Sequence, residues 1–133
     1  MKTIAQQLNV TEFPYREKDA RGNVTYYEDS DKYWRKREFG LKHNNETYYE
    51  DSDGSWQKRE FDKNNNEIYY ENSKGFWSKS KFDKNGNQIY YENSKGFWVK
   101  SEFDKNRNEI YFENSNGTIV DNRPSNGMED NIR

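Results

Sequence analysis

The sequence predicts an all-β protein, a tandem-repeat antiparallel β-meander of about ten strands with a short N-terminal helix. Three observations predict it. Tyr pairs and Trp residues recur with one period, turn-forming residues separate the aromatic segments, and residue types alternate within each segment as they do along strands. We expect a single curved sheet or a solenoid-like coil.

The period divides the chain into three parts. The Tyr pairs begin at Tyr26, Tyr48, Tyr69, Tyr90 and Tyr111, in one step of 22 residues and three of 21. The tryptophans keep the same step. The predicted parts are a capping helix in 1–12, five β-hairpin repeats in 13–118, and a last strand with a disordered tail in 119–133. The repeats are 13–33, 34–55, 56–76, 77–97 and 98–118.

The composition sets how such a chain can be ordered. Only 29% of the residues are hydrophobic and 35% are charged, which by itself is typical of disorder. The 17% aromatic content opposes that, because each ring buries a large area and favours strands. Aliphatic residues are too few for an ordinary core, so we expect the rings to stack along the repeat.

Charge and cysteine usage exclude several classes of function. The 22 basic and 24 acidic residues give a net charge of −2, so we do not expect direct nucleic-acid binding. The chain has no cysteine. The beginning of the chain lacks the apolar run of a signal peptide, and no stretch could span a bilayer. We therefore expect a cytoplasmic protein without membrane contact.

The N-terminal helix is predicted over residues 3–9. Thr3 is its expected cap, and Ile4 and Leu8 lie four residues apart on one face. Because so short a helix is unstable alone, we expect it to pack on the first repeat and cover the open sheet edge.

Each repeat is predicted to be a hairpin. In the fourth repeat, turn residues 83–86 separate the strands 76–82 and 87–92, and Gly86 suits a positive φ. The second repeat has one extra turn residue, at 40–44, which should leave the strand register intact. Arg107 stands at the Gly86 position of its repeat, so we expect its turn to be the most strained or irregular.

This turn length predicts pairs of Phe82 with Asn87, Ser80 with Ile89, and Ser78 with Tyr91. The pleat then divides the side chains between two faces. One face carries Phe76, Phe82, Ile89 and Tyr91, and the other carries Trp77, Lys79, Lys81, Tyr90 and Glu92. Since both faces carry rings, the sheet must coil, pair with a second copy, or keep one face for a partner.

The face with the tryptophans is the predicted binding surface for a protein, because Trp and Tyr among charged residues are typical of interface hot spots. Lys79 beside Tyr90 also suits a stabilising cation–π pair. The candidate residues are Trp34, Trp56, Trp77, Trp98, Tyr48, Tyr69, Tyr90, Lys58, Lys79, Lys100, Glu71 and Glu92.

No catalytic residue, metal ligand or cofactor is predicted, and we do not expect an enzyme. A catalytic site needs distinct groups that converge, whereas a repeat supplies the same groups everywhere. The single histidine, His43, has no second His or Cys to complete a ligand set. The acidic turns 29–31 and 51–54 resemble fragments of calcium loops but lack the closing Glu.

Three repeat families share features with the span 22–117. The segment from Phe82 to Asn87 resembles the Tyr-Asp repeat of Rhs-type proteins, which implies a long meander of hairpins. The match recurs at Phe61-Asp62 and Phe103-Asp104. The segment 90–98 resembles choline-binding and glucan-binding hairpins of cell-surface proteins, although their Gly-Trp step is missing. The hairpin plan is also similar to MORN repeats, without their regular glycines.

As a whole, the sequence resembles small repeat proteins encoded by bacteriophages. This resemblance implies an anti-CRISPR-like inhibitor that occupies the surface of a host defence protein or nuclease. A homodimer is a further possible state. The alternative functions are a glycan-binding or cell-wall-binding module and a purely structural, self-assembling repeat.

Overall fold

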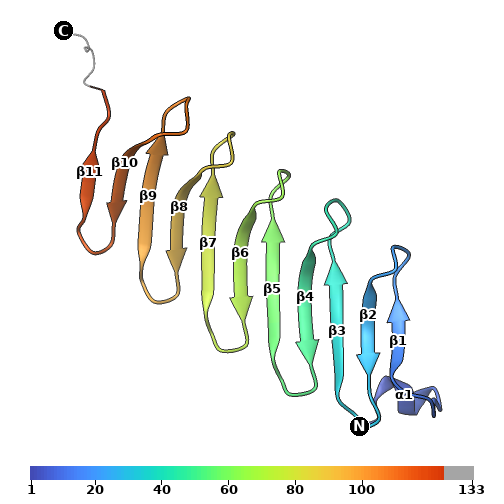
Figure 1. Cartoon of the computed structure of the whole chain (residues 1–133). Coiled ribbons are helices and arrows are strands. Elements are labelled where there is room, and N and C mark those ends of the chain that lie inside the picture. The colour runs from blue at the N-terminus through green and yellow to red at the C-terminus, as the bar shows by residue number, and fades with distance from the viewer. Residues whose placement is uncertain (125–133) are drawn as a thin grey trace. The chain divides into compact units, whose positions relative to one another are not determined.

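The computed structural model describes residues 1–124, so most of the tail predicted to be disordered lies outside the described residues. The strands follow one another in the sheet in chain order, and each hydrogen-bonds its neighbours (Figure 1). The first and last strands have one neighbour each, so both edges of the sheet are open. The elements are α1 (Ile4–Gln7), β1 (Tyr15–Lys18), β2 (Val24–Glu28), β3 (Trp34–Phe39), β4 (Glu46–Asp51), β5 (Trp56–Phe61), β6 (Glu67–Asn72), β7 (Trp77–Phe82), β8 (Gln88–Asn93), β9 (Trp98–Phe103), β10 (Glu109–Asn114) and β11 (Ile119–Asp121).

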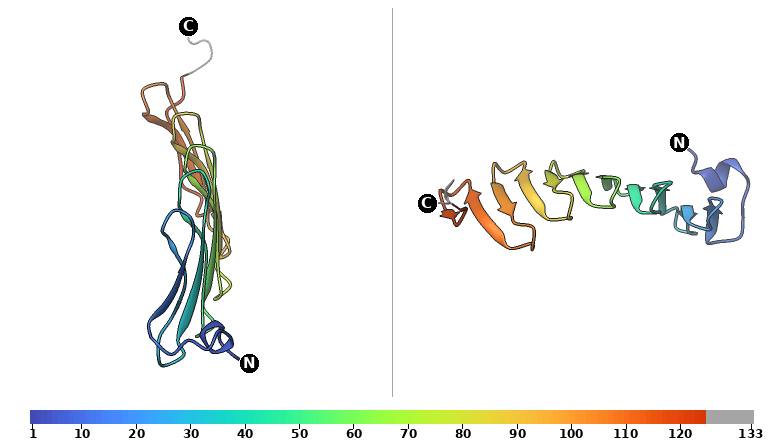
Figure 2. Two further views of the ribbon diagram at one scale, coloured as in Figure 1. Left: turned by 90° about the vertical axis from the view of Figure 1, so that its right-hand side faces the viewer. Right: turned by 90° about the horizontal axis from the view of Figure 1, so that it is seen from above.

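The meander consists of two compact units. Unit 1 comprises residues 1–60 and 70–75, and unit 2 comprises residues 61–69 and those from 76 onward. Within each unit the strands form a single layer (Figure 2). The predicted β-meander is therefore confirmed, and within residues 1–124 no helix is long and apolar enough to cross a bilayer.

The turns are built on one plan, which the turn of the fourth repeat illustrates. The Asp83 N–H donates to the Asn87 carbonyl at 2.9 Å, and the Gly86 N–H donates to the Asp83 carbonyl at 3.0 Å. The Asp83 side chain accepts from the N–H groups of Asn85 and Asn87. Gly86 has φ 84°, the left-handed conformation that glycine adopts without a steric cost. Sequence-local bonds thus fix where each strand ends.

The turn with the extra residue preserves the register, as predicted. The Gly40 N–H donates to the Asn45 carbonyl at 2.8 Å and closes the longer loop. Lys36 then pairs with Glu50 across β3 and β4, just as Lys79 pairs with Glu92 across β7 and β8. The extra residue is absorbed outside the ladder.

Of the strain or irregularity predicted for the turn at Arg107, the irregularity is not observed, because the hydrogen bonds of Arg107 match those of the other turns. Its N–H donates to the Asp104 carbonyl at 3.0 Å, as Gly86 does to Asp83. Arg107 adopts φ 66° to do so. The turn keeps its geometry because the bonds to Asp104 and Asn108 all remain, and Arg107 carries the conformational cost.

The predicted pairs of the central hairpin are also wrong. Phe82 pairs with Gln88 and Ser80 with Tyr91, because Asp83 pairs with Asn87 in the turn and a bulge follows between Lys81 and Phe82. Each irregularity shifts the register by one residue. A shift of one residue would exchange the two faces, but a shift of two residues restores them. The predicted division of side chains between the faces is therefore correct, although the cross-strand partners differ.

The N-terminal helix is shorter than predicted and docks differently. Thr3 is its N-cap, as expected, within a capping box that includes Gln6. The Ala5 N–H donates to Glu28, at the end of β2, so the helix packs on one face of the sheet and not over its edge (Figure 2). Ala5 is fully buried, whereas Leu8 of the predicted apolar pair is 56% exposed.

The interior of the protein is small. Among residues 1–124, the buried positions are Ala5, Tyr26, Glu28, Asp51 and Ser101. The tryptophans are half-buried. As predicted, aromatic contacts along the sheet take the place of an aliphatic core.

Candidate protein-binding face

One face of the sheet repeats four kinds of side chain, Trp, Lys, Tyr and Glu, and we call it the Trp–Lys face. Pairing across the strands brings together Tyr48 with Lys58, and Glu50 with Trp56, in unit 1. In unit 2 the same pairs are Tyr90 with Lys100, and Glu92 with Trp98. The face consists of Trp34, Lys36, Tyr48, Glu50, Trp56 and Lys58 in unit 1, and of Trp77, Lys79, Lys81, Tyr90, Glu92, Trp98, Lys100, Tyr111 and Glu113 in unit 2.

Each tryptophan of this face lies under a lysine of its own strand. The Nζ atom lies 5.2 or 5.3 Å from the centre of the Trp ring in all four cases. The two residues are two positions apart, so the pleat directs both to one side. The lysines concerned, Lys36, Lys58, Lys79 and Lys100, remain exposed. The ammonium groups are thus held at fixed positions while they still face solvent.

Three carboxylates of the face, Glu50, Glu92 and Glu113, accept from tyrosine hydroxyls two residues away. The Tyr48 hydroxyl donates to Glu50 at 3.1 Å, and the Tyr111 hydroxyl donates to Glu113 at 2.8 Å. Burial and the nearby Glu50 carboxylate raise the pKa of Tyr48, and the hydrogen bond to Glu113 raises that of Tyr111. These carboxylates are half-buried. Glu50 and Glu113 therefore lie deeper than the lysine ammonium groups, whereas Glu38, Glu60 and Glu102 of the same face are exposed.

The structure brings most of the predicted residues together within their units. Trp34, Trp56, Tyr48 and Lys58 share the Trp–Lys face of unit 1. The predicted residues of unit 2 on this face are Trp77, Trp98, Tyr90, Lys79, Lys100 and Glu92. Tyr69 and Glu71 are two residues apart on β6 and so share one side of that strand.

The lysine that contacts Tyr90 differs from the predicted one. Lys81 lies 5.9 Å from the centre of the Tyr90 ring, whereas Lys79 lies over Trp77. Lys81 is the direct cross-strand partner of Tyr90, and Lys79 pairs with Glu92. The revised register explains the difference.

A shallow hollow opens on this face of unit 2. It encloses about 420 Å³ between Tyr90 and Tyr111, and Lys81, Lys100 and Glu102 contribute to its walls. Ile89 and Ser101 complete the lining. Two rings and two ammonium groups around one depression suit a side chain that is partly apolar and carries an acidic group nearby.

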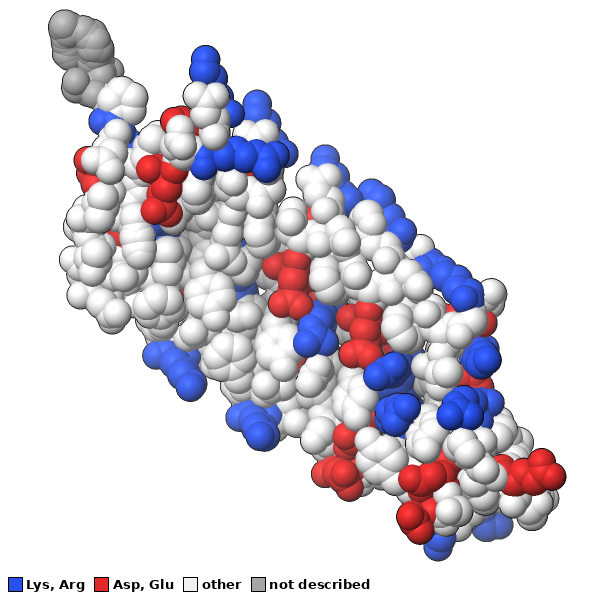
Figure 3. All heavy atoms as spheres, in the orientation of Figure 1, with Lys and Arg blue, Asp and Glu red and all other residues white. Residues whose placement is uncertain are grey.

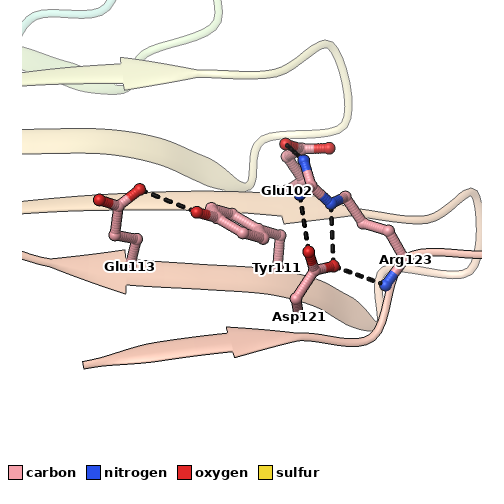
Figure 4. A network of polar contacts seen from close by, with 5 residues as sticks. All are labelled: Glu102, Tyr111, Glu113, Asp121 and Arg123. Carbon is pink, nitrogen blue, oxygen red and sulfur yellow. Dashed lines mark hydrogen bonds and ion pairs between the residues drawn. The ribbon is translucent and has the colours of Figure 1, made fainter. Parts of the chain in front are cut away.

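Arg123 closes this end of the face, and we did not predict it as a site residue. Its guanidinium contacts Asp121 at 2.7 Å and Glu102 at 3.1 Å, and its Cζ atom lies 4.1 Å from the centre of the Tyr111 ring (Figure 4). The hydrogen bond from Arg123 lowers the pKa of Asp121. Arg123 follows Glu102 by one 21-residue period, and this spacing is the signal that could have identified it.

The acidic turns use their carboxylates to close the backbone. Asp51 accepts from the N–H groups of Asp53 and Ser55 and from the Tyr49 hydroxyl. Asp29 accepts from the N–H groups of Asp31 and Tyr33 in the same way. In residues 1–124, no cluster of three His, Asp or Glu side chains is placed to hold a metal ion.

Comparison with known proteins concerns the fold alone. No protein-family model matches the chain, and no curated protein is similar to it in sequence. Solved structures of Tc toxin complexes are similar: TcdB2-TccC3-TEV with a TM-score of 0.55, TcdB2-TccC3-Cdc42 with 0.54, and the Photorhabdus luminescens Tc holotoxin pore with a TccC3 variant, with 0.52. Each is 11% identical over 86% of this chain.

This chain spans only 6% of the length of those toxin chains. They contain shells of Rhs-type Tyr-Asp repeats, so the similarity agrees with the resemblance of the 82–87 segment to that repeat. The chain is thus a tandem β-hairpin repeat protein. The comparisons give no support to the resemblance to bacteriophage repeat proteins or to the inhibitor function that it implied.

Proposed function

We propose that the protein is a non-enzymatic binding module that recognises an acidic surface of another protein through the Trp–Lys face of β7 to β10. One observation carries the proposal. On this face the lysines are held outward over rings, while the carboxylates are occupied by tyrosine hydroxyls or by Arg123.

The charge arrangement supports an acidic partner although the whole chain has a net charge of −2. Lys79, Lys81 and Lys100 are exposed. Glu102 and Asp121 are paired with Arg123. An approaching surface therefore meets exposed ammonium groups together with carboxylates that already have a cationic partner, and such local complementarity governs association rates and specificity more than net charge does.

The same geometry favours a protein over a glycan. Sugars stack on open faces of aromatic rings, whereas each Trp ring here has an ammonium group over it. The hollow between Tyr90 and Tyr111 could receive one side chain of the partner and so act as the anchor of the interface. A cytoplasmic setting and a defence-related partner stay predictions from the sequence.

A charge-reversal experiment tests this function. The wild-type chain is immobilised and exposed to bacterial lysate, and captured proteins are identified and then titrated as pure components. Lys79→Glu with Lys100→Glu should weaken binding of the acidic partner at least tenfold, and added salt should weaken wild-type binding. Lys84→Glu with Lys105→Glu makes the same charge change in the turns and should bind like wild type.

Circular dichroism must show that both double variants are folded. Equal binding by the Lys79/Lys100 variant and the wild type would contradict the proposal. Retention on a glycan array that requires Trp77 and Trp98 would instead support the glycan-binding alternative.

A further inference from the structure

The face of the sheet opposite the Trp–Lys face differs between the two units, and we call it the opposite face. In unit 1, arginines cover its rings. Tyr27 pairs with Arg16 and Arg35, whose Cζ atoms lie 5.4 and 4.3 Å from the ring centre. Arg37 lies 6.0 Å from the Tyr49 ring. The long side chains act as a built-in cover for these rings.

Glu46 holds this cover in place. Its carboxylate lies 3.0 Å from Arg37 and 3.7 Å from Arg59. Arg59 in turn lies 4.9 Å from the Tyr70 ring. On the opposite face of unit 1, the protein's own arginine side chains therefore cover the aromatic rings, so no second protein is required to shield them from solvent.

In unit 2 small residues replace these arginines. Tyr91 pairs with Ser80 and Val99, and Phe112 pairs with Ser101 and Val120. In the described part of the chain no cation lies over either ring, while Phe97 tilts against Tyr91 at 6.3 Å. The rings of unit 2 thus lack the cover that those of unit 1 have.

The loss of charge is visible on the surface. In Figure 3, basic and acidic atoms lie side by side over β3 to β5, whereas the surface over β8 to β10 is white apart from the strand ends. The acidic residue Glu109 lies at the beginning of β10, at this rim. In a chain with 35% charged residues, this uncharged patch contrasts with the charged face of unit 1.

The spacing of the rings selects the partner. Tyr91 and Phe112 lie on β8 and β10, with the small side chains of β7, β9 and β11 beside them. Neighbouring strands are about 4.8 Å apart, so the rings recur at about 10 Å. A sheet with the same ring period, shifted by one strand, places its rings over these small residues repeatedly. A second copy of the chain has this period by construction.

We propose that the opposite face of β7 to β11 is a self-association surface, on which a second copy packs face to face through the same strands. Two uncharged faces can come together without the burial of an unpaired charge. The arginine-covered face of unit 1 offers no such uncharged surface. The result is a symmetric dimer that leaves both Trp–Lys faces exposed.

Sedimentation of the full chain from low micromolar to millimolar concentration tests this proposal. We expect a species of twice the 16.2 kDa chain mass, with a population that rises with concentration. The variant Ser78→Arg with Ser80→Arg gives β7 the arginines that β3 carries at Arg35 and Arg37, so the fold has a precedent for both side chains. We expect it to remain a monomer throughout this range, with an unchanged circular dichroism spectrum.

The control Asn106→Arg with Asn116→Arg adds the same charge in exposed turns and should dimerise like wild type. Lys79→Glu with Lys100→Glu should also dimerise, which separates this surface from the proposed function. A monomeric wild type over the whole range, or a dimer that tolerates both arginines on β7, would overturn the proposal. If the β7 variant fails to fold, Val99→Gln, which copies Gln57, should shift the dissociation constant upward, and no shift would count against it.

Discussion

At the level of single residues, each hairpin depends on one left-handed backbone position. Glycine fills it at Gly86 and Gly96, but Lys32 and Arg107 also adopt it, with φ 70° and 66°. A side chain with a Cβ pays a steric cost in this region, whereas glycine does not. The repeat tolerates the exceptions because the flanking hydrogen bonds determine the turn.

This cost makes a prediction for Arg107. We expect Arg107→Gly to raise the free energy of unfolding by about 1 kcal/mol, because relief of the left-handed strain exceeds the added freedom of the unfolded chain. Urea denaturation measures the change. Gly86→Ala is the converse control: its Cβ would meet no atom within 4 Å, so the expected loss of about 1 kcal/mol reflects the backbone alone. A stabilising Gly86→Ala would contradict this account.

At the level of elements, α1 is held by one buried carboxylate. Glu28 is 1% exposed and accepts from the Thr3 hydroxyl at 2.6 Å, the Tyr26 hydroxyl at 2.8 Å and the Ala5 N–H at 3.1 Å. Burial alone would raise the pKa of Glu28, but these hydrogen bonds outweigh it and lower the pKa. The helix has four residues and could not persist without this anchor.

We therefore expect Glu28→Gln to destabilise the docked helix by about 1 to 3 kcal/mol, because an amide places N–H groups against donors. Hydrogen exchange at the Ala5 amide reports the docking. Glu50→Gln, at the equivalent position of β4, should have a smaller effect, since the Tyr48 hydroxyl is its side-chain donor. Similar exchange rates at Ala5 in wild type and Glu28→Gln would disprove the anchor.

Acid should release the same helix. A carboxyl group with a lowered pKa in the folded state stabilises the fold above its usual value of 4.5, and this contribution disappears as the pH falls through the folded pKa. In the wild type, the Ala5 amide should therefore keep its protection from exchange at neutral pH and lose it only as the pH falls below 4.5. In Glu28→Gln the pH dependence of docking should be absent, and an unchanged dependence would contradict the assignment.

At the level of the whole molecule, tyrosines that donate to carboxylates recur along the sheet. Burial raises the pKa of Tyr48 and of Tyr90, and the bond to Glu113 raises that of Tyr111 above the usual 10.0. A raised pKa in the folded state gives stability that is complete below pH 10 and is lost as the pH rises through the folded pKa. We expect a cooperative alkaline transition, followed by tyrosinate absorbance and circular dichroism together. Ionisation of all tyrosines near pH 10 without unfolding would contradict it.

Repetition itself makes another prediction. Deletion of 77–97 joins Phe76 to Trp98 and recreates the native Phe97-Trp98 junction. Because each repeat contacts mainly its neighbours, the shortened chain should keep the β spectrum of the full chain and unfold at a lower temperature. Deletion of 77–87, which removes β7 alone, should destabilise the sheet more, because β8 then takes the place of β7 and loses its native cross-strand partners. Equal melting temperatures for the two deletions would argue against the repeat as the unit of folding.

The sequence by itself determined the number of repeats, the strands, the turns and the side chains that share the Trp–Lys face, because these depend on period and on bonds between near neighbours. It also placed the Thr3 cap. Only the tertiary structure decided that Ser80 pairs with Tyr91, that Glu28 anchors α1, and that the rings of unit 2 lack the arginine cover of unit 1. Cross-strand partners depend on bulges and on contacts between residues that are distant in the sequence. The alternating pattern of side chains determines which face of the sheet a residue occupies, but not which residue it pairs with.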